Sequence, residues 1–93
     1  MITAKTQGLA RGERVSFYLE NKYVARVHLD KDFNIVGKDG KAPDGTVKAY
    51  SKDGKLEKEF VFEKNEVKIL RVYGPGGLLK TEYGYKDDKA VKK

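Results

Sequence analysis

The stretch GTVKAYSKDGKLEKEFVF, residues 45–62, points most directly to the fold class of this chain. Apolar and polar side chains alternate on both sides of the turn residues KDG at 52–54, a pattern typical of two antiparallel strands joined by a tight turn. Gly54 stands where a three-residue hairpin loop requires a left-handed backbone, which glycine adopts without steric strain. The stretch therefore predicts a β-hairpin.

The same pattern occurs three times along the chain, which predicts a repeat fold. An offset of 23 residues aligns Tyr50 with Tyr73, Gly54 with Gly77, Leu56 with Leu79, Glu59 with Glu82, Phe60 with Tyr83 and Phe62 with Tyr85. An offset of 33 residues in the opposite direction aligns Gly12 with Gly45, Phe17 with Tyr50, Asn21 with Gly54, Tyr23 with Leu56 and Val27 with Phe60. We therefore expect hairpin repeats at about residues 12–32, 45–66 and 68–89, an inserted strand at 33–37 and a charged tail at 86–93.

The turn positions also predict which residues face each other across each hairpin. The expected pairs are Phe17 with Tyr23, Tyr50 with Leu56, Lys48 with Lys58, Tyr73 with Leu79 and Arg71 with Thr81. This register places the large apolar residues on one face, namely Val15, Phe17, Tyr23, Val27, Leu29, Tyr50, Leu56, Phe60, Phe62, Ile69, Tyr73, Leu79, Tyr83 and Tyr85. The other face is then mostly charged, as in an antiparallel sheet with one solvated side. We predict one all-β domain over residues 1–93, an antiparallel meander of about six or seven strands in a single twisted or curled sheet.

The unit at 45–62 resembles the MORN-variant repeat, whose pattern runs roughly G-x-x-x-x-Y-x-x-[DN]-G-x-[LV]-x-x-E-x-x-[YF]. The third unit of this chain lacks the leading glycine. The first unit has Asn21 in place of the turn glycine and lacks the glutamate. Arrays of this unit occur in bacterial YwqK-type antitoxins and in bacterial surface proteins. The resemblance thus implies a bacterial, antitoxin-like or surface protein.

Composition limits the classes of partner and chemistry. The net charge is +6, but lysine alternates with acidic residues through most of the chain, which favours a solvated surface over a block that binds nucleic acid. The chain has no cysteine, which excludes disulfides and thiol catalysis. It has no apolar run near the roughly 18 residues of a membrane span. The compartment stays open between the bacterial cytoplasm and, if a signal peptide was removed, the periplasm or cell surface.

Two candidate ligand motifs fail on inspection. Residues 30–34 begin like a calcium loop, but Ile35 stands where that loop needs glycine and Lys41 where it needs a bidentate glutamate. His28 is the only histidine, and the sequence supplies no neighbouring ligand or base for it. We therefore expect no catalytic residue, no metal site, no cofactor and no enzymatic activity.

One group of residues remains as a candidate binding surface: Lys48, Lys58, Arg71, Tyr50, Tyr73 and Phe17. In the predicted register the cations lie between two rows of apolar side chains, and Lys48 faces Lys58 despite the repulsion between like charges. One explanation is that the aliphatic parts of these side chains cover apolar surface while their charged ends reach water. The other is a basic groove that binds an acidic peptide, a glycan or single-stranded bases. We predict a non-catalytic module that binds a partner protein or itself. The alternative is a basic module for anionic ligands, either nucleic acid or acidic lipid headgroups.

Overall fold

A computed structural model describes residues 2–93, and the all-β prediction is confirmed. The described residues form nine strands and one short 3-10 turn: β1 (Ile2–Leu9), β2 (Gly12–Leu19), β3 (Lys22–Asp30), β4 (Ile35–Gly40), β5 (Gly45–Tyr50), β6 (Leu56–Glu63), β7 (Glu66–Tyr73), η1 (Pro75–Gly77), β8 (Leu79–Lys86) and β9 (Lys89–Lys92). The prediction of about six or seven strands was too low because it missed β1 and β9. β1 alternates small and polar residues that give little apolar signal, and β9 lies in the expected charged tail.

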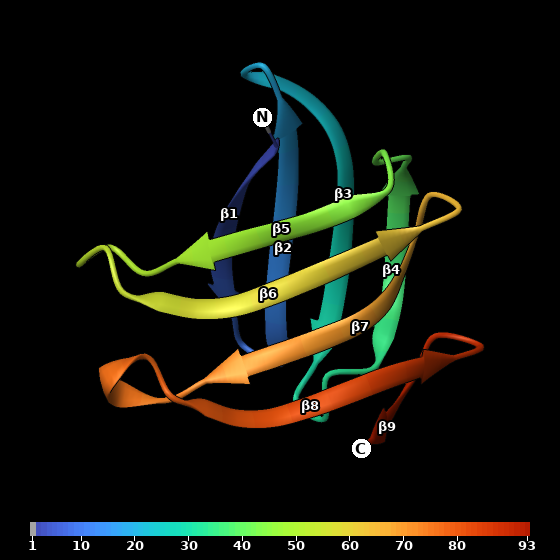
Figure 1. Ribbon diagram of the computed structural model, residues 1–93. Coiled ribbons are helices and arrows are strands. Elements are labelled where there is room, and N and C mark those ends of the chain that lie inside the picture. Colours follow the sequence, from blue (N-terminus) through green and yellow to red (C-terminus); the bar gives the residue numbers. More distant parts are fainter. Residues whose placement is uncertain (1) are drawn as a thin grey trace.

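The nine strands form one mixed sheet in the order β4-β3-β2-β1-β5-β6-β7-β8-β9. Strands β1–β4 are one antiparallel meander and β5–β9 are another. They join through a single parallel pair, Ala4 with Ala49, so the prediction of a purely antiparallel meander is wrong at this junction. Strands β5–β8 cross in front of the first meander (Figure 1), and the curled sheet is nearly closed into a barrel.

The crossover from β4 to β5 depends on Gly40. Its φ is +74°, and a side chain here would place Cβ 2.1 Å from the carbonyl oxygen of Val24. Only glycine fits this left-handed position against the backbone. The next residue, Lys41, donates its N–H to the same Val24 carbonyl at 3.1 Å, and Ala42 is fully buried. The crossover is therefore anchored before the chain enters β5.

The hairpins β5–β6 and β7–β8 are closed by equivalent backbone hydrogen bonds, 23 residues apart, and the second loop has one further positive φ, at Gly76. Ser51 N–H donates to the carbonyl of Lys55 at 2.8 Å, and Gly74 N–H donates to the carbonyl of Leu78 at 2.9 Å. Gly54 and Gly77 both have φ near +80°. The first predicted unit differs, because Glu20 and Asn21 both have positive φ and form a two-residue turn.

A β-bulge shifts the register in five of the hairpins. In each, the second strand carries one extra residue shortly after the turn: Val24, Val36, Glu57, Lys68 and Lys80. The predicted pairs next to the longer loops, Tyr50 with Leu56 and Tyr73 with Leu79, are confirmed. Beyond the bulge the prediction was wrong by one residue, since Lys48 faces Glu59 and Arg71 faces Glu82. In the first hairpin Phe17 faces Ala25, and Tyr23 faces Tyr18.

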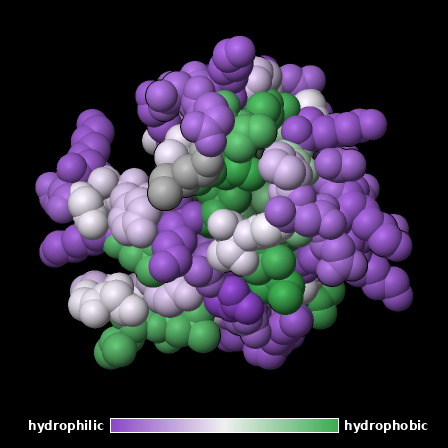
Figure 2. Space-filling model, turned by 45° about the horizontal axis from the view of Figure 1, so that its top comes forward, coloured by the Kyte–Doolittle hydropathy of each residue, from purple (hydrophilic) through white to green (hydrophobic). Residues whose placement is uncertain are grey.

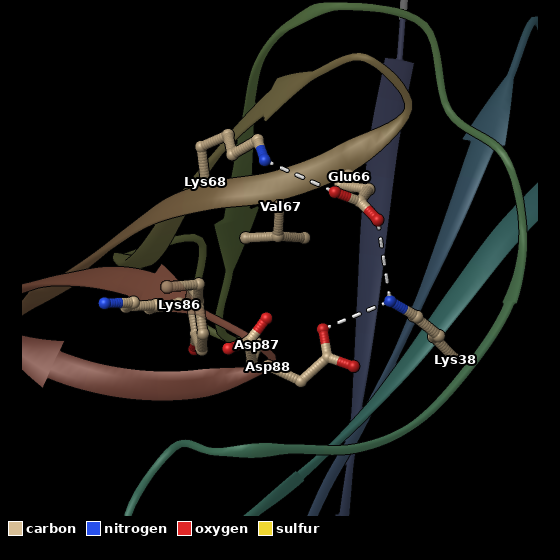
Figure 3. Close-up of a pocket in the computed structure, with 8 residues that line it drawn as sticks. Lys38, Glu66, Val67, Lys68, Lys86, Asp87 and Asp88 are labelled. Carbon is tan, nitrogen blue, oxygen red and sulfur yellow. Dashed lines mark hydrogen bonds and ion pairs between the residues drawn. The ribbon is translucent and has the colours of Figure 1, made fainter.

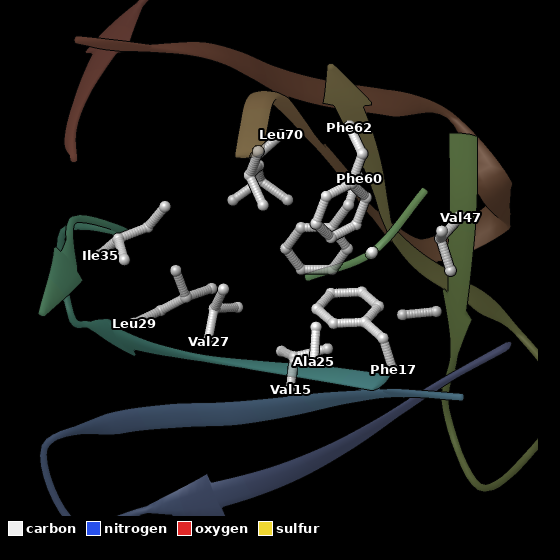
Figure 4. Packing of buried hydrophobic residues seen from close by; sticks show 13 residues of the cluster. Val15, Phe17, Ala25, Val27, Leu29, Ile35, Val47, Phe60, Phe62 and Leu70 are labelled. Atoms are coloured by element: carbon white, nitrogen blue, oxygen red, sulfur yellow. The ribbon is translucent and has the colours of Figure 1, made fainter. Parts of the chain in front are cut away.

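The core lies between the two meanders (Figure 4). Phe17 packs edge-on against Phe60 and Phe62, with ring centroids 5.2 and 4.9 Å apart. The expected core residues Val15, Phe17, Val27, Leu29, Phe60 and Phe62 are buried, and so are Ala25, Ile35, Ala42, Val47, Ala49, Val67 and Leu70, which were not expected. The bulges at Val24 and Lys80 turn Tyr23 and Leu79 outward, and their exposed fractions are 45% and 54%. Tyr50, which is 53% exposed, points outward because it follows the buried Ala49 in the regular alternation of β5. The assignment of these three residues to the core face was therefore wrong, and so was that of Leu56, Ile69 and Tyr73, since none of the six belongs to the buried cluster or packs against it.

Polar contacts close the gap between the edge strands β4 and β9. Ile35 N–H donates to the carbonyl of Asp88 at 2.8 Å, and Tyr85 Oη donates to the carbonyl of Phe33 at 2.6 Å. Lys38 binds both Asp88, at 3.1 Å, and Glu66, at 3.7 Å (Figure 3). The hydrogen bond to Asp88 raises the pKa of Lys38. These contacts give the outer edges partners that strand pairing alone does not provide.

The face assignment is tested by truncating one residue from each side of the sheet. Phe60→Ala removes a fully buried ring and should lower the free energy of unfolding by about 3–5 kcal/mol. Leu79→Ala, on the solvent side, should lower it by about 0.5 kcal/mol or less. Urea denaturation measures both, and similar losses for the two variants would show that the bulged register is wrong.

The closing contact of Tyr85 predicts a pH dependence of stability. Burial raises the pKa of Tyr85 in the folded chain, so its contribution is full below the unfolded pKa of about 10 and falls as the pH rises above that value. The wild-type chain should lose stability between pH 9 and about pH 11. Tyr85→Phe should be less stable at neutral pH by about 1 kcal/mol but lose less in that interval. Urea denaturation of both proteins at the two pH values measures these losses. Equal losses of stability in the wild-type chain and in Tyr85→Phe would contradict the role of Tyr85.

Candidate functional site

A row of alternating charges crosses the outer face of the second meander. Lys48 faces Glu59, Glu59 faces Arg71, and Arg71 faces Glu82 on four successive strands. Arg71 binds both neighbouring carboxylates at 2.7 Å, and these hydrogen bonds raise its pKa. Tyr73 also donates its hydroxyl to Glu59 at 3.2 Å. Glu59, Arg71 and Glu82 therefore form a connected network, in which Glu59 binds both Arg71 and Tyr73.

Apolar and small residues form a second row beside these charges. Thr46 faces Val61, Val61 faces Ile69, Ile69 faces Gly84 and Gly84 faces Val91. Val61 and Ile69 are partly exposed and Val91 is 55% exposed. A glycine within a strand often marks a place where another backbone or a ligand approaches closely. A Cβ at Gly84 would lie 3.2 Å from Cε of Lys93, so the side chain of Lys93 lies over this position of the row.

A third row lies on the other side of the charges, where the bulges at Glu57 and Lys80 bring Leu56 and Leu79 to the outer face beside Tyr50 and Tyr73. It contains Tyr50, Leu56, Tyr73 and Leu79, one from each of β5 to β8. None of these side chains belongs to the buried cluster or packs against it. We call the three rows together the striped face.

Two apolar rows on a solvent-facing sheet are unusual. In an antiparallel sheet with one buried face, the exposed face is ordinarily polar. Contiguous apolar surface on a soluble chain marks an interaction site more often than chance exposure. Figure 2 shows hydrophobic patches between the hydrophilic side chains that cover most of the face in view. The striped face is the strongest candidate for the functional site.

The structure separates the six residues predicted as one binding surface. Lys48, Arg71, Tyr50 and Tyr73 lie on the striped face, whereas Phe17 is fully buried in the core. Lys58 points to the interior side of β6, with 7% of its surface exposed. The predicted binding surface did not contain Glu59, Glu82 or Val61, nor Ile69, which was expected in the core. The equivalence of Glu59 and Glu82 across the 23-residue offset was the available signal, but a register without bulges placed them away from Arg71.

Lys58 forms an internal ion pair with Glu13 of β2. Its Nζ donates a hydrogen bond to Oε2 at 3.0 Å and lies 2.8 Å from Oε1. The pair lies beside an open cavity of about 380 Å³ whose lining includes Leu9, Phe33 and Asp30. A buried ammonium needs a partner of opposite charge, and the carboxylate of Glu13 supplies it. No bound ligand is needed to explain the position of Lys58. We interpret Lys58 as structural.

The described residues give no sign of a metal centre. Within residues 2–93, no group of three or more histidine, aspartate or glutamate side chains lies close enough to hold a metal ion. The same part of the chain has no helix of the length and apolarity that crossing a membrane requires.

Comparison of the chain with family models, curated proteins and solved structures gives no match. The resemblance to the MORN-variant repeat stays a prediction.

The structural role of Lys58 predicts a specific pattern of stability changes. Lys58→Met should cost about 2–3 kcal/mol, because it leaves the Glu13 carboxylate without its cation in a site with limited solvent access. The double variant Lys58→Met/Glu13→Leu should regain most of that loss, since neither charge then remains buried. Urea denaturation of the two variants measures the difference, and a double variant as unstable as the single one would refute the interpretation.

Proposed function

We propose that this chain is a non-catalytic protein-binding module and that the striped face is its binding surface. The observation that carries the proposal is the pair of apolar rows on a sheet face that no other element of residues 2–93 covers. Burial of such rows against a partner removes apolar area from water, which is the main driving force of association. The charged row between them provides specificity through its order of signs.

The order of charges favours a second copy of the chain as the partner. From β5 to β8 the row runs positive, negative, positive, negative. A two-fold axis parallel to the strands, between β6 and β7, reverses this order. It brings Lys48 opposite Glu82 of the second copy and Glu59 opposite Arg71 of the second copy. Every charge then meets an opposite charge, as a self-complementary two-fold interface requires.

The same axis also matches the apolar rows. It leaves each row on its own side of the charges, so Val61 lies opposite Ile69 of the second copy, and Tyr50 lies opposite Leu79 of the second copy. Aligned packing of two sheets, at about 30°, is a common arrangement for such faces. The striped face is thus complementary to itself in charge and in hydrophobicity.

The resemblance to MORN-variant repeats supports a second form of the same function. An antitoxin-like chain would bind a toxin protein, and the striped face would be the surface available for it. This form and self-association use the same residues, so they would compete with each other.

Two charge reversals test the two-fold arrangement. Lys48→Glu places a carboxylate opposite Glu82 of the second copy, and Glu82→Lys places an ammonium opposite Lys48. Each variant alone should dissociate at least about tenfold more readily than the wild-type chain, because like charges face each other twice. An equimolar mixture of the two should form a heterodimer, since the carboxylate introduced at position 48 of one chain then meets the ammonium introduced at position 82 of the other. Analytical ultracentrifugation across a hundredfold dilution measures all three samples.

Lys22→Glu is the matched control, because it changes the net charge by the same amount as Lys48→Glu but lies at the first residue of β3, in the other meander. It should leave the dissociation constant unchanged. A wild-type chain that remains monomeric at every concentration would refute self-association. A mixture no more associated than its components would refute the two-fold axis.

A further inference from the structure

The outer face of the first meander carries a different set of side chains. Three cross-strand rows contain them: Thr3, Tyr18 and Tyr23; Lys5, Ser16 and Arg26; and Gln7, Arg14 and His28. All of these residues are partly or fully exposed. We call this surface the basic face, since its charged members are Lys5, Arg14 and Arg26, with His28 beside them.

Two tyrosines and two cations are already arranged for stacking on this face. The rings of Tyr18 and Tyr23 meet edge to face, with centroids 6.2 Å apart. Lys5 Nζ lies 5.3 Å from the centroid of the Tyr18 ring, and the guanidinium of Arg26 lies 5.7 Å from that of Tyr23. Tyr23 remains 45% exposed. The face therefore presents aromatic surface with a positive charge next to each ring.

The positive charges of the basic face are only partly compensated. Asp39, which faces Arg26, accepts a hydrogen bond from Tyr23 Oη at 2.6 Å, and this raises the pKa of Tyr23. Asp30, at the end of β3, accepts hydrogen bonds from the backbone of Asp32 and Asn34. Arg14 Nε is buried and has no hydrogen-bond partner among the described residues. The striped face, in contrast, alternates cations with carboxylates.

We propose that the basic face binds single-stranded nucleic acid, laid across β1, β2 and β3. Its bases stack on Tyr18 and Tyr23, and its phosphates lie near Lys5, Arg14 and Arg26. Aromatic side chains beside cations on a sheet are how proteins hold single strands without reading their sequence, because every base offers a π face. A duplex hides those faces within its own stack, so the tyrosines favour single strands.

This site is independent of the protein-binding function proposed above. The basic face belongs to β1–β3 and the striped face to β5–β9, and the two meanders pack core to core (Figure 1). Their solvent-facing sides therefore point in different directions and meet only where β1 adjoins β5, at Thr3 and Lys48. A chain paired through the striped face still exposes its basic face.

Fluorescence anisotropy tests the proposal by measuring how tightly two labelled probes bind to the full chain over a range of salt concentrations. The probes are fluorescein-labelled oligo(dT) and a fluorescein-labelled mixed-sequence single-stranded RNA. Contact with three cations predicts that the logarithm of the association constant falls with the logarithm of salt concentration with a slope of about −2. Lys5→Glu/Arg26→Glu should weaken binding at least about tenfold. The control Lys52→Glu/Lys55→Glu changes the net charge equally in the exposed loop after β5 and should weaken binding less than about threefold.

Stacking is tested separately at Tyr23. Tyr23→Ala should weaken binding about five- to a hundredfold, the range for loss of one base–aromatic contact. Tyr23→Phe keeps the ring and loses the hydrogen bond to Asp39, so its affinity should stay within about twofold of wild type. Circular dichroism confirms that each variant keeps its fold.

Three results would overturn the proposal. Equal losses in the two double variants would show that only net charge matters. Equal losses in Tyr23→Ala and Tyr23→Phe would show that the ring does not stack. Binding of phosphatidylserine vesicles that displaces the oligonucleotide and does not depend on Tyr23 would identify the face as a lipid surface instead.

Discussion

A single extra residue in the second strand of five hairpins shapes the whole of this sheet. A bulge bends its strand and increases the local twist, and bulges at matching positions curl a sheet in one direction. Here they bring the two meanders face to face around Phe17, Phe60 and Leu70. The same bulges reverse which side chains face outward beside each turn.

That reversal gives the two meanders outer surfaces of different character around one core. Leu79 and Tyr23 would be core residues in a regular hairpin, but the bulges at Lys80 and Val24 turn them into solvent. On the second meander they extend the apolar rows, and on the first they add an aromatic ring beside Arg26. The two surfaces differ because carboxylates fill alternate positions of the charged row on the striped face, whereas the basic face has few.

Two adjacent charged residues of β6 are nearly buried, and each forms an ion pair with a residue of another strand. Lys58 points inward to Glu13, and Glu59 points outward to Arg71. Both are nearly buried, and a buried charge without a partner is costly. Since each has a partner from another strand, the two ion pairs also fix the register of β6 against its neighbours. Their roles nevertheless differ, because only the outer pair lies on a surface that a second protein can reach.

Local patterns in the chain were enough to establish the all-β class, the hairpins and their turns, because alternation and turn residues act over a few positions. The 23-residue offset correctly related the geometry of Gly54 to that of Gly77. The bulges, the parallel contact of Ala4 with Ala49 and the strands at the two ends of the chain became apparent only in the folded sheet. A bulge is an interruption in the pairing of two strands, so the alternation of residues within one strand does not show where it falls. Since one residue of slip exchanges the two faces of a strand, neither outer surface could be assigned before the sheet was closed.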